Sequence, residues 1–599
     1  MNCKNPNINN PKFENLFQKA FECHQTGDLE LAERHYQKVV NMQPEHIDVL
    51  FLLGTLNLQR RNFEAANMFL KKALKLKPDH AAAYANLGNV LKEQGKFNEA
   101  IENYNRVIEL KPDCADVYFN IGNTFRELGE YGKAIENYKQ SVCLGPNCPE
   151  VYCNLGGVFH KSGNLYQAEK NYRHAINLKP DYAMAHNNIG NVFKEQGKLD
   201  KAISSYNMAI SFKSGYAEAY YNLGNALKDR GRIDNAEDSY RRAIEYKPDY
   251  AEAHNNLGNL LQEQGRHDEA LAGFNKAIMI KTDYVEAHLN RSIESLLAGN
   301  YKRAWPEYEW RLRTSDCIVH NFQQPGWNGS SLSGQTILVH AEQGMGDTFQ
   351  FIRYLPLVKA KGGKVIFECQ KMLFRLLQNN KSADEIVERT PDFESDLRFD
   401  VHIPLLSLPG IFGTTLENIP SKVPYISANP MLVEQWREKH KPNGLFKIGI
   451  VWAGNSKHKN NHNRSCSLAD YAPLGNLPGL AFYSLQKGPE SAEALKPPGE
   501  MKIKDLDNEL NDFADTAAVI ANMDLIISID SSVAHLAGAM GKPVWVLLPF
   551  APDWRWMLDR DDSPWYPGMR LFRQNKYNEW SGVFEQVKKT LICKLRIFK

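Results

Sequence analysis

The sequence predicts an all-helical solenoid in its first half, followed by an α/β region made of two parallel-sheet lobes. Three observations lead to this prediction. Small residues recur with a period of 34 up to about residue 310, the period stops after Trp310, and short apolar runs then alternate with helical patterns. At 599 residues the chain is also too long for a single hydrophobic core.

The repeat is defined by three columns of small residues. The first begins at Ala20 and continues as glycine at 54, 88, 122, 156, 190, 224 and 258. A second glycine column follows seven residues later, with Arg61 as its exception, and an unbroken alanine column from Ala32 to Ala304 follows five residues after that. Small residues let two antiparallel helices pack closely, a glycine makes the turn between them, and prolines near the unit ends stop the second helix.

A unit of this length with these positions resembles the tetratricopeptide repeat (TPR). We therefore predict nine TPR repeats forming an all-α superhelix over residues 13–318, after a disordered N-terminus at 1–12. The ninth repeat is degenerate, with Ser292 in the first small-residue column, and the first is expected to act as a cap.

An asparagine stands two residues before the first-column position in seven successive repeats. Asn is a mediocre helix former, but its amide can pair with both the N–H and the C=O of an extended peptide. The column resembles the one that lines the superhelix of O-linked N-acetylglucosamine transferase, which implies a protein or peptide partner on the concave face. Alternatively, these side chains only bridge neighbouring helices or persist from duplication of the repeat. The predicted peptide groove comprises Asn86, Asn120, Asn154, Asn188, Asn222, Asn256 and Asn290.

A linker at 319–335, rich in Gly, Pro and Ser, leads into the α/β region. Two blocks separated by a Pro-rich stretch predict an N-terminal Rossmann-like lobe at 336–440 and a C-terminal Rossmann-like lobe at 441–599, with ligands at the carboxyl ends of the strands. Strands are expected at 336–341, 364–369, 446–454, 480–486, 524–530 and 543–549. Helices are expected from about 348 and at 371–380, 512–522, 531–541 and 579–595.

The segment Glu342-Gln343-Gly344-Met345-Gly346-Asp347, named here the glycine loop, follows the first of these strands. Gly344 and Gly346 allow the backbone to approach a ligand closely. Asp347 stands at the opening of a helix, where the ionised carboxylate is favoured, and this suits a general base. The same position also suits a simple helix cap.

A second motif, Asp530-Ser531-Ser532 with His535, lies where another strand runs into a helix. Backbone N–H groups and two hydroxyls at a helix start predict an anion site suited to a pyrophosphate, and His535 lies one turn inside that helix. The loops after 446–454 and 480–486 should open on the same site. They carry the further candidates Arg464, Gln486 and Lys487, of which the two cations would neutralise phosphates unless they are ordinary surface charges.

The glycine loop together with D-S-S-x-x-H-L-A-x-A-x-G-K-P, from Asp530 to Pro543, resembles the ADP-heptose:lipopolysaccharide heptosyltransferases. More closely, it resembles bacterial TPR proteins with a heptosyltransferase-like C-terminal domain. The resemblance covers about 325–590 and implies a GT-B fold, with Asp347 as the catalytic base and the second motif holding the donor. This sequence departs from the pattern at Ser532, where heptosyltransferases usually have glycine, and its first lobe is short.

These features together predict an inverting, metal-independent glycosyltransferase. It would use a nucleotide sugar as substrate, without a further cofactor, and act on a protein or peptide held by the TPR groove. One alternative hypothesis is a TPR adaptor whose transferase-like domain is inactive. Another is a sugar-polymer enzyme whose solenoid only recruits partners.

Composition and local patterns narrow the class of protein. The formal net charge is only +2, which argues against nucleic-acid binding. The sequence has no long apolar segment and no signal-peptide pattern, so no membrane span is predicted. Cysteines scattered without C-x-x-C pairs predict reduced thiols and a cytoplasmic location. The segment 559–562 (DRDD) lies after the last predicted strand, where a metal-binding D-x-D is not expected, so no metal site is predicted.

Overall fold

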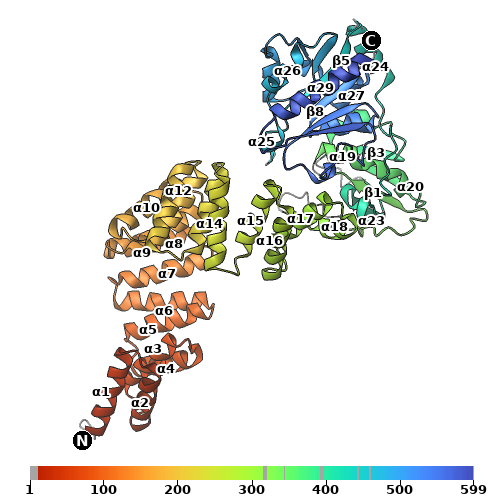
Figure 1. Ribbon diagram of the computed structural model, residues 1–599. Helices are drawn as coiled ribbons and strands as arrows, with labels where there is room; N and C mark the ends of the chain where they lie inside the picture. The colour runs from red at the N-terminus through yellow and green to blue at the C-terminus, as the bar shows by residue number, and fades with distance from the viewer. Residues whose placement is uncertain are drawn as a thin grey trace. The chain divides into compact units, whose positions relative to one another are not determined.

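The computed structural model describes residues 11–314, 320, 322–342, 344–390, 397–440, 444–456 and 460–597. The chain divides into two compact units, Met1–Pro248 and Asp249–Lys599. The predicted fold class is confirmed, because a TPR-type solenoid of helices precedes an α/β region with two parallel sheets (Figure 1). Of the predicted disordered segment, residues 1–10 lie outside the described residues, whereas Pro11 and Lys12 begin the first helix.

The first unit is built from helix pairs, one pair per repeat. Its helices are α1 (Pro11–Gln25), α2 (Leu29–Met42), α3 (Ile47–Gln59), α4 (Phe63–Leu76), α5 (Ala81–Glu93), α6 (Phe97–Leu110), α7 (Ala115–Glu127), α8 (Tyr131–Leu144), α9 (Pro149–Lys161), α10 (Leu165–Leu178), α11 (Ala183–Glu195), α12 (Leu199–Phe212), α13 (Ala217–Asp229) and α14 (Ile233–Tyr246). The second unit opens with the last repeats: α15 (Ala251–Glu263), α16 (His267–Ile280), α17 (Val285–Leu297), α18 (Tyr301–Tyr308) and the 3₁₀ segment η1 (Glu309–Arg313).

The small-residue columns have direct structural causes. A Cβ atom on Gly88 would lie 2.5 Å from the ring of Tyr104 on the partner helix, and corresponding glycines face Tyr138, Tyr172, Tyr206 and Tyr240 in the same way. The alanines of the third column are fully buried. The turn glycines have φ between +73° and +85°, which only glycine adopts freely. Arg61, the one residue of this turn column that is not glycine, has a φ of +59°.

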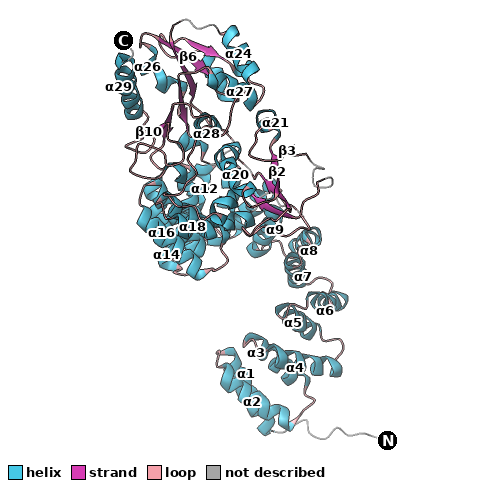
Figure 2. Ribbon diagram, turned by 90° about the vertical axis from the view of Figure 1, so that its right-hand side faces the viewer, coloured by secondary structure: helices cyan, strands magenta, loops and turns pink. Residues whose placement is uncertain are grey.

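The α/β region holds two sheets whose strands all run parallel. The first sheet has the order β3-β2-β1-β4, and the second has the order β10-β9-β8-β5-β6-β7. The strands are β1 (Thr336–His340), β2 (Lys364–Cys369), β3 (Glu385–Glu388), β4 (Val401–Pro404), β5 (Phe446–Val451), β6 (Leu480–Ser484), β7 (Ile503–Asp505), β8 (Leu525–Ile529), β9 (Val544–Leu548) and β10 (Met569–Arg573). Figure 2 shows the strands gathered in the α/β region, while the solenoid is helical.

Helices flank both sheets. The first block carries α19 (Met345–Phe351), α20 (Leu355–Lys359), α21 (Lys371–Leu377) and α23 (Leu408–Ile411). The second carries α25 (Asn461–Arg464), α26 (Ala472–Gly475), α27 (Phe513–Ala521), α28 (Ser532–Ala539) and α29 (Ser581–Ile597). Between the blocks, α24 (Pro430–Lys439) packs against α27. The lobe boundaries near residue 440 remain predictions.

Each sheet contains one point where the strand order reverses, and these two points are where ligands bind in open α/β sheets. In the first sheet the reversal lies between β1 and β4, and in the second it lies between β5 and β8. The glycine loop follows β1, and Asp530 follows β8. The fold therefore places each motif at the switch point of its own sheet. Among the described residues, no helix combines the length and apolar character needed to cross a membrane.

Candidate functional site

The two sequence motifs meet within the second unit. A Cβ atom on Gly346 would lie 3.0 Å from Cδ2 of His535 and 3.7 Å from Cα of Ser532. The glycine loop thus packs on the first turn of α28 with no room for a side chain between them. Two segments separated by almost two hundred residues of chain are thus in direct contact.

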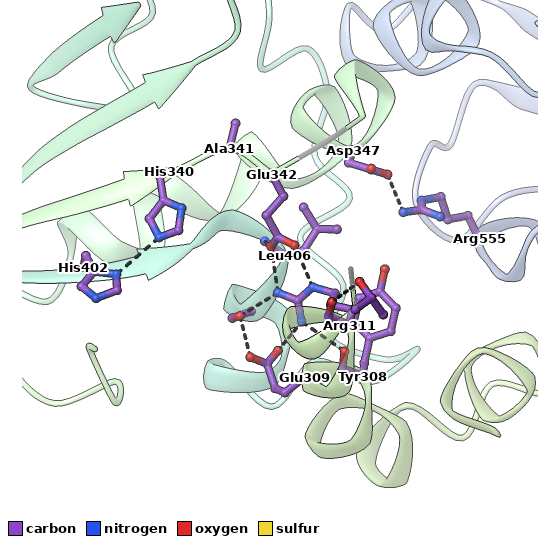
Figure 3. A network of polar contacts seen from close by, with 12 residues as sticks. Tyr308, Glu309, Arg311, His340, Ala341, Glu342, Asp347, His402, Leu406 and Arg555 are labelled. Carbon is purple, nitrogen blue, oxygen red and sulfur yellow. Dashed lines mark hydrogen bonds and ion pairs between the residues drawn. The ribbon is translucent and has the colours of Figure 1, made fainter. Parts of the chain in front are cut away.

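Asp347 lies in the first turn of α19 and reaches toward the second lobe (Figure 3). Its Oδ1 accepts a hydrogen bond of 2.6 Å from Nη2 of Arg555, and its side chain is 27% exposed. A Cβ atom on Gly344 would collide with Oδ2 of Asp347, so the glycine leaves the space that the carboxylate occupies. The helix begins at Met345, three residues earlier than predicted, because the extended Gly344 serves as its N-cap.

Arg555, which the sequence did not single out, joins the two lobes. Its Nε donates to Oε1 of Gln350 at 2.7 Å, and its Nη1 donates to Oδ1 of Asp553 at 2.9 Å. The guanidinium also lies 4.5 Å from the ring centroid of Trp554. Burial opposes its charge, but the carboxylates of Asp553 and Asp347 hold the pKa of Arg555 well above its usual value. The sequence could have pointed to Arg555 through its position after β9, because the carboxyl end of that strand lies at the same sheet edge as Asp530.

Asp530 and His535 form a second pair of neighbouring polar side chains. Oδ1 of Asp530 lies 3.7 Å from Nε2 of His535, and the two side chains are 14% and 6% exposed. Burial works to raise the pKa of Asp530, but the interaction with His535 and the charges of Arg464 and Arg555 outweigh it, so this pKa is lowered. The second lobe therefore places two arginines, Arg464 and Arg555, near one carboxylate.

The ring of His535 is fixed from two sides. Its Nδ1 lies 2.9 Å from the hydroxyl of Tyr566, and its ring stacks on Trp556 with centroids 5.2 Å apart. Ser531 is the N-cap residue of α28, but its side chain makes no capping hydrogen bond and instead pairs with Ser528 at 2.8 Å. The first turn of α28 thus lacks a side-chain cap, which suits the predicted anion site.

The three remaining donor-site candidates have different surroundings. Arg464 ends α25 in the loop after β5, and a Cβ atom on Gly454 would lie 2.7 Å from its Nη2. This contact with Gly454, three residues after β5 ends, places Arg464 beside the second switch point. Lys487 is 53% exposed and pairs with Asp507 at 2.9 Å, so its described contacts do not bring it to Asp530.

Gln486 is buried, with 2% exposed, and its amide is occupied by backbone. Its Oε1 accepts the N–H groups of Trp452 and Ala453 at 3.1 and 2.9 Å, and its Nε2 donates to the carbonyls of Ala453 and Lys487 at 3.0 and 2.9 Å. In this structure Gln486 therefore fixes the start of the loop after β5.

The asparagine column shows the bridging that we considered as an alternative. The side-chain amides donate to residues of the preceding repeat, as with Asn86 to Thr55 and Asn154 to Asn123, both at 2.9 Å. Asn222 and Asn290 donate to Asn187 and Asn255 at 3.0 Å, and Asn188 lies 3.9 Å from Sγ of Cys153. A neighbouring asparagine column, at 89, 123, 191 and 225, accepts the hydroxyls of the tyrosines that pack on the glycines. Peptide binding by the column remains a prediction.

The segment 559–562 is internally paired, since Nε and Nη2 of Arg560 donate to the carboxylate of Asp562 at 2.7 and 2.8 Å. Within the parts of the chain that the structure describes, no group of three His, Cys, Asp or Glu side chains is arranged to hold a metal ion.

Comparison with known proteins identifies the classes that this chain resembles. Residues 486–548, from just after β6 through β9, match glycosyltransferase family 9 (heptosyltransferase). Residues 25–81 match the tetratricopeptide repeat, and residues 79–291 match the cilia and flagella-associated protein 70 C-terminal domain. The predicted resemblance to TPR proteins with a heptosyltransferase-like segment is thereby confirmed.

Particular relatives cover parts of the chain. Protein FlbA of Caulobacter vibrioides (strain ATCC 19089 / CIP 103742 / CB 15) is 26% identical over 314 residues, which are 49% of this chain and 52% of FlbA. The match thus spans about half the length of this curated relative. Among solved structures, MamA is 30% identical over 28% of this chain and 92% of its own, with a TM-score of 0.26. PilF of Pseudomonas aeruginosa is 22% identical over 36% and 97%, with a TM-score of 0.33.

Proposed function

We propose that this protein is a glycosyltransferase that moves a sugar from a nucleotide-sugar donor to a protein or peptide acceptor bound by the TPR solenoid. The observation that carries the proposal is the contact of Gly346 with the first turn of α28, which brings Asp347, Asp530 and His535 into one site. The family-9 match over 486–548 supports a donor site on the second lobe.

In the proposed reaction, Asp347 removes the proton of the acceptor hydroxyl as that oxygen bonds to the anomeric carbon of the sugar. The bond from that carbon to the donor phosphate breaks with inversion, and the nucleotide diphosphate leaves with the electron pair. Ser531, Ser532 and Arg464 bind and neutralise the diphosphate, while Asp530 and His535 hold the sugar. Arg555 orients Asp347 for proton removal. Lys487 could join the donor site only by leaving Asp507, and Gln486 shapes the loop that carries Arg464.

Nucleotide binding is the first test of this proposal. Calorimetry of the purified protein with UDP, GDP, ADP and dTDP should show micromolar affinity for one of them. Incubation with nucleotide sugars and cell lysate, followed by intact-mass analysis, then identifies sugar and acceptor. The variant Asp347→Ala should abolish transfer but keep nucleotide affinity. Unchanged turnover in this variant removes Asp347 from the mechanism.

A second candidate function is a TPR adaptor with an inactive transferase-like domain. The observation that favours it is the ion pair of Asp347 with buried Arg555, because this pair already engages Oδ1 of the carboxylate that would take the acceptor's proton. The adaptor binds none of the four nucleotides, so the same calorimetry separates the two functions.

The peptide groove is tested on the solenoid itself. Replacing Asn154, Asn188 and Asn222 together by Ala should weaken acceptor binding, because the three amide groups removed from the column could no longer bind peptide backbone. Asn103 and Asn137 lie on the second helices, where each donates to a backbone carbonyl of its own helix, so their Ala variants are matched controls. Equal acceptor affinity in both sets would leave the column with its bridging role alone. A cytoplasmic location, with reduced thiols, fits this proposal.

A further inference from the structure

The last turn of the solenoid is bonded to the start of the glycine loop (Figure 3). Arg311, in η1, makes a two-pronged ion pair with Glu342: Nε donates to Oε2 at 2.9 Å, and Nη2 donates to Oε1 at 2.8 Å. The two side chains are only 8% and 13% exposed. This pair of parallel hydrogen bonds fixes orientation as well as distance.

The same guanidinium also reaches the other side of the first switch point. Nη2 of Arg311 donates to Oγ of Ser407 at 2.8 Å, and Ser407 in turn donates to Glu309 at 2.8 Å. The N–H of Leu406 donates to Glu342 at 3.3 Å. One arginine from the solenoid therefore joins the segments that follow β1 and β4, the two strands between which a ligand crevice is expected.

The glycine loop is consequently held at both ends by arginines from other parts of the unit. Arg311 binds Glu342 at its first residue, and Arg555 binds Asp347 at its last. Nη1 of Arg389 supports the carbonyl of Glu342 at 3.0 Å. Gly346 packs on α28, whereas Gly344, just before α19, has no side chain to fix the backbone there. The arginine anchors therefore help to set where α19 begins and where Asp347 points.

We propose that Arg311 is a positioning residue of the transfer site, through which the end of the solenoid fixes the glycine loop and the direction of Asp347. The inference rests on the proposed function, in which Asp347 takes the acceptor's proton. It gives the last repeat a role in the chemical step itself, beyond recruitment of an acceptor. Removing the Arg311 anchor should therefore lower kcat by a larger factor than it raises KM or lowers the affinity for the nucleotide.

The test compares Arg311→Gln with Arg291→Gln. Arg291 makes a similarly buried two-pronged ion pair with Glu307, in the same repeat but away from the glycine loop, and is the matched control. Hydrogen–deuterium exchange should be faster at residues 344–351 in Arg311→Gln than in the control. Its kcat should fall by about 10²-fold, the loss typical of a small misplacement of a reacting group. Nucleotide affinity should be unchanged.

Two further variants keep the test decisive if Arg311→Gln folds poorly. Arg311→Lys keeps the charge but cannot form the fork, so it should show intermediate exchange and an intermediate kcat. The double variant Arg311→Gln with Glu342→Gln also removes the carboxylate that Arg311→Gln leaves buried and unpaired. On a free-energy scale, its loss of kcat should therefore be smaller than the sum of the losses of the two single variants. Strict additivity, or loop exchange equal to that of the control, would overturn the inference. If wild type transfers no sugar but loop exchange still responds to Arg311, the proposed function fails and the anchoring stands.

Discussion

His340, the last residue of β1, should make the second unit sensitive to mild acid. The side chain is 5% exposed, its Nδ1 has no hydrogen-bond partner in the described structure, and its Nε2 lies 3.4 Å from Nδ1 of His402. Burial, followed by the charges of His320, His402, Arg389 and Arg311, lowers the pKa of His340 to about 2. The folded chain therefore keeps this ring neutral at pH 5, while the unfolded chain protonates it.

The size of the effect follows from proton linkage. An unfolded histidine titrates near pH 6.5, so between pH 7 and pH 5 the unfolded state gains a proton at this site that the folded state does not bind. Stability is therefore lost as the pH falls below about 6.5, by about 2 kcal/mol at pH 5. In His340→Leu this contribution disappears, so the free energy of unfolding should fall by about 2 kcal/mol less than in wild type over the same interval.

Urea unfolding followed by tryptophan fluorescence measures this directly, because all ten tryptophans lie at or after Trp305 and thus report on the second unit alone. The exposed His462, replaced by Gln, is the control and should keep the pH dependence of wild type. Parallel losses of stability in wild type and His340→Leu between pH 7 and pH 5 would show that His340 is not held neutral by the fold.

Three further predictions concern the glycine loop and the repeats. Gly344 has an ordinary negative φ, so Gly344→Ala should change the urea midpoint little. The added Cβ should displace the carboxylate of Asp347 and thereby lower the rate of transfer. A large fall in the urea midpoint together with the fall in rate would contradict this. Arg555→Gln leaves a partly buried carboxylate unpaired and should lower the free energy of unfolding by about 3 kcal/mol, measured by tryptophan fluorescence; a loss below the scatter of replicate curves would contradict it. Gly129→Ala meets no neighbour within 4 Å but has φ of +76°, so it should destabilise the first unit by about 1 kcal/mol in thermal circular dichroism, and an unchanged midpoint would exclude backbone strain.

The regular parts of the fold were accessible from the sequence because their causes repeat or are local. The period of 34 reflects one packing relation, a glycine against a large side chain that is usually aromatic, and the central strands are continuous apolar runs. The strands β3, β4, β7 and β10 escaped prediction. They are the edge strands of the two sheets, and each is short, with no more than two consecutive apolar residues.

The site was only partly accessible for a similar reason. Both motifs were found because each lies on a strand-to-helix turn with glycine, serine or aspartate. Arg555 pairs with Asp347 across 208 residues and Arg311 with Glu342 across 31, and neither separation leaves a local pattern. Gln486 illustrates the opposite case, since its position after β6 was foreseen but its attachment to backbone depends on side-chain direction.

The glycine, tyrosine and asparagine that pack together within a repeat have a consequence for how the number of repeats can change in evolution. In four repeats the tyrosine hydroxyl bonds to an asparagine fifteen residues earlier in the same repeat, so each of these units is held together by a bond of its own. A whole 34-residue unit can then be gained or lost by duplication or deletion without disturbing the fastening of the others. The number of repeats can change in this way without altering the segment around Arg311, which is bonded to the α/β region.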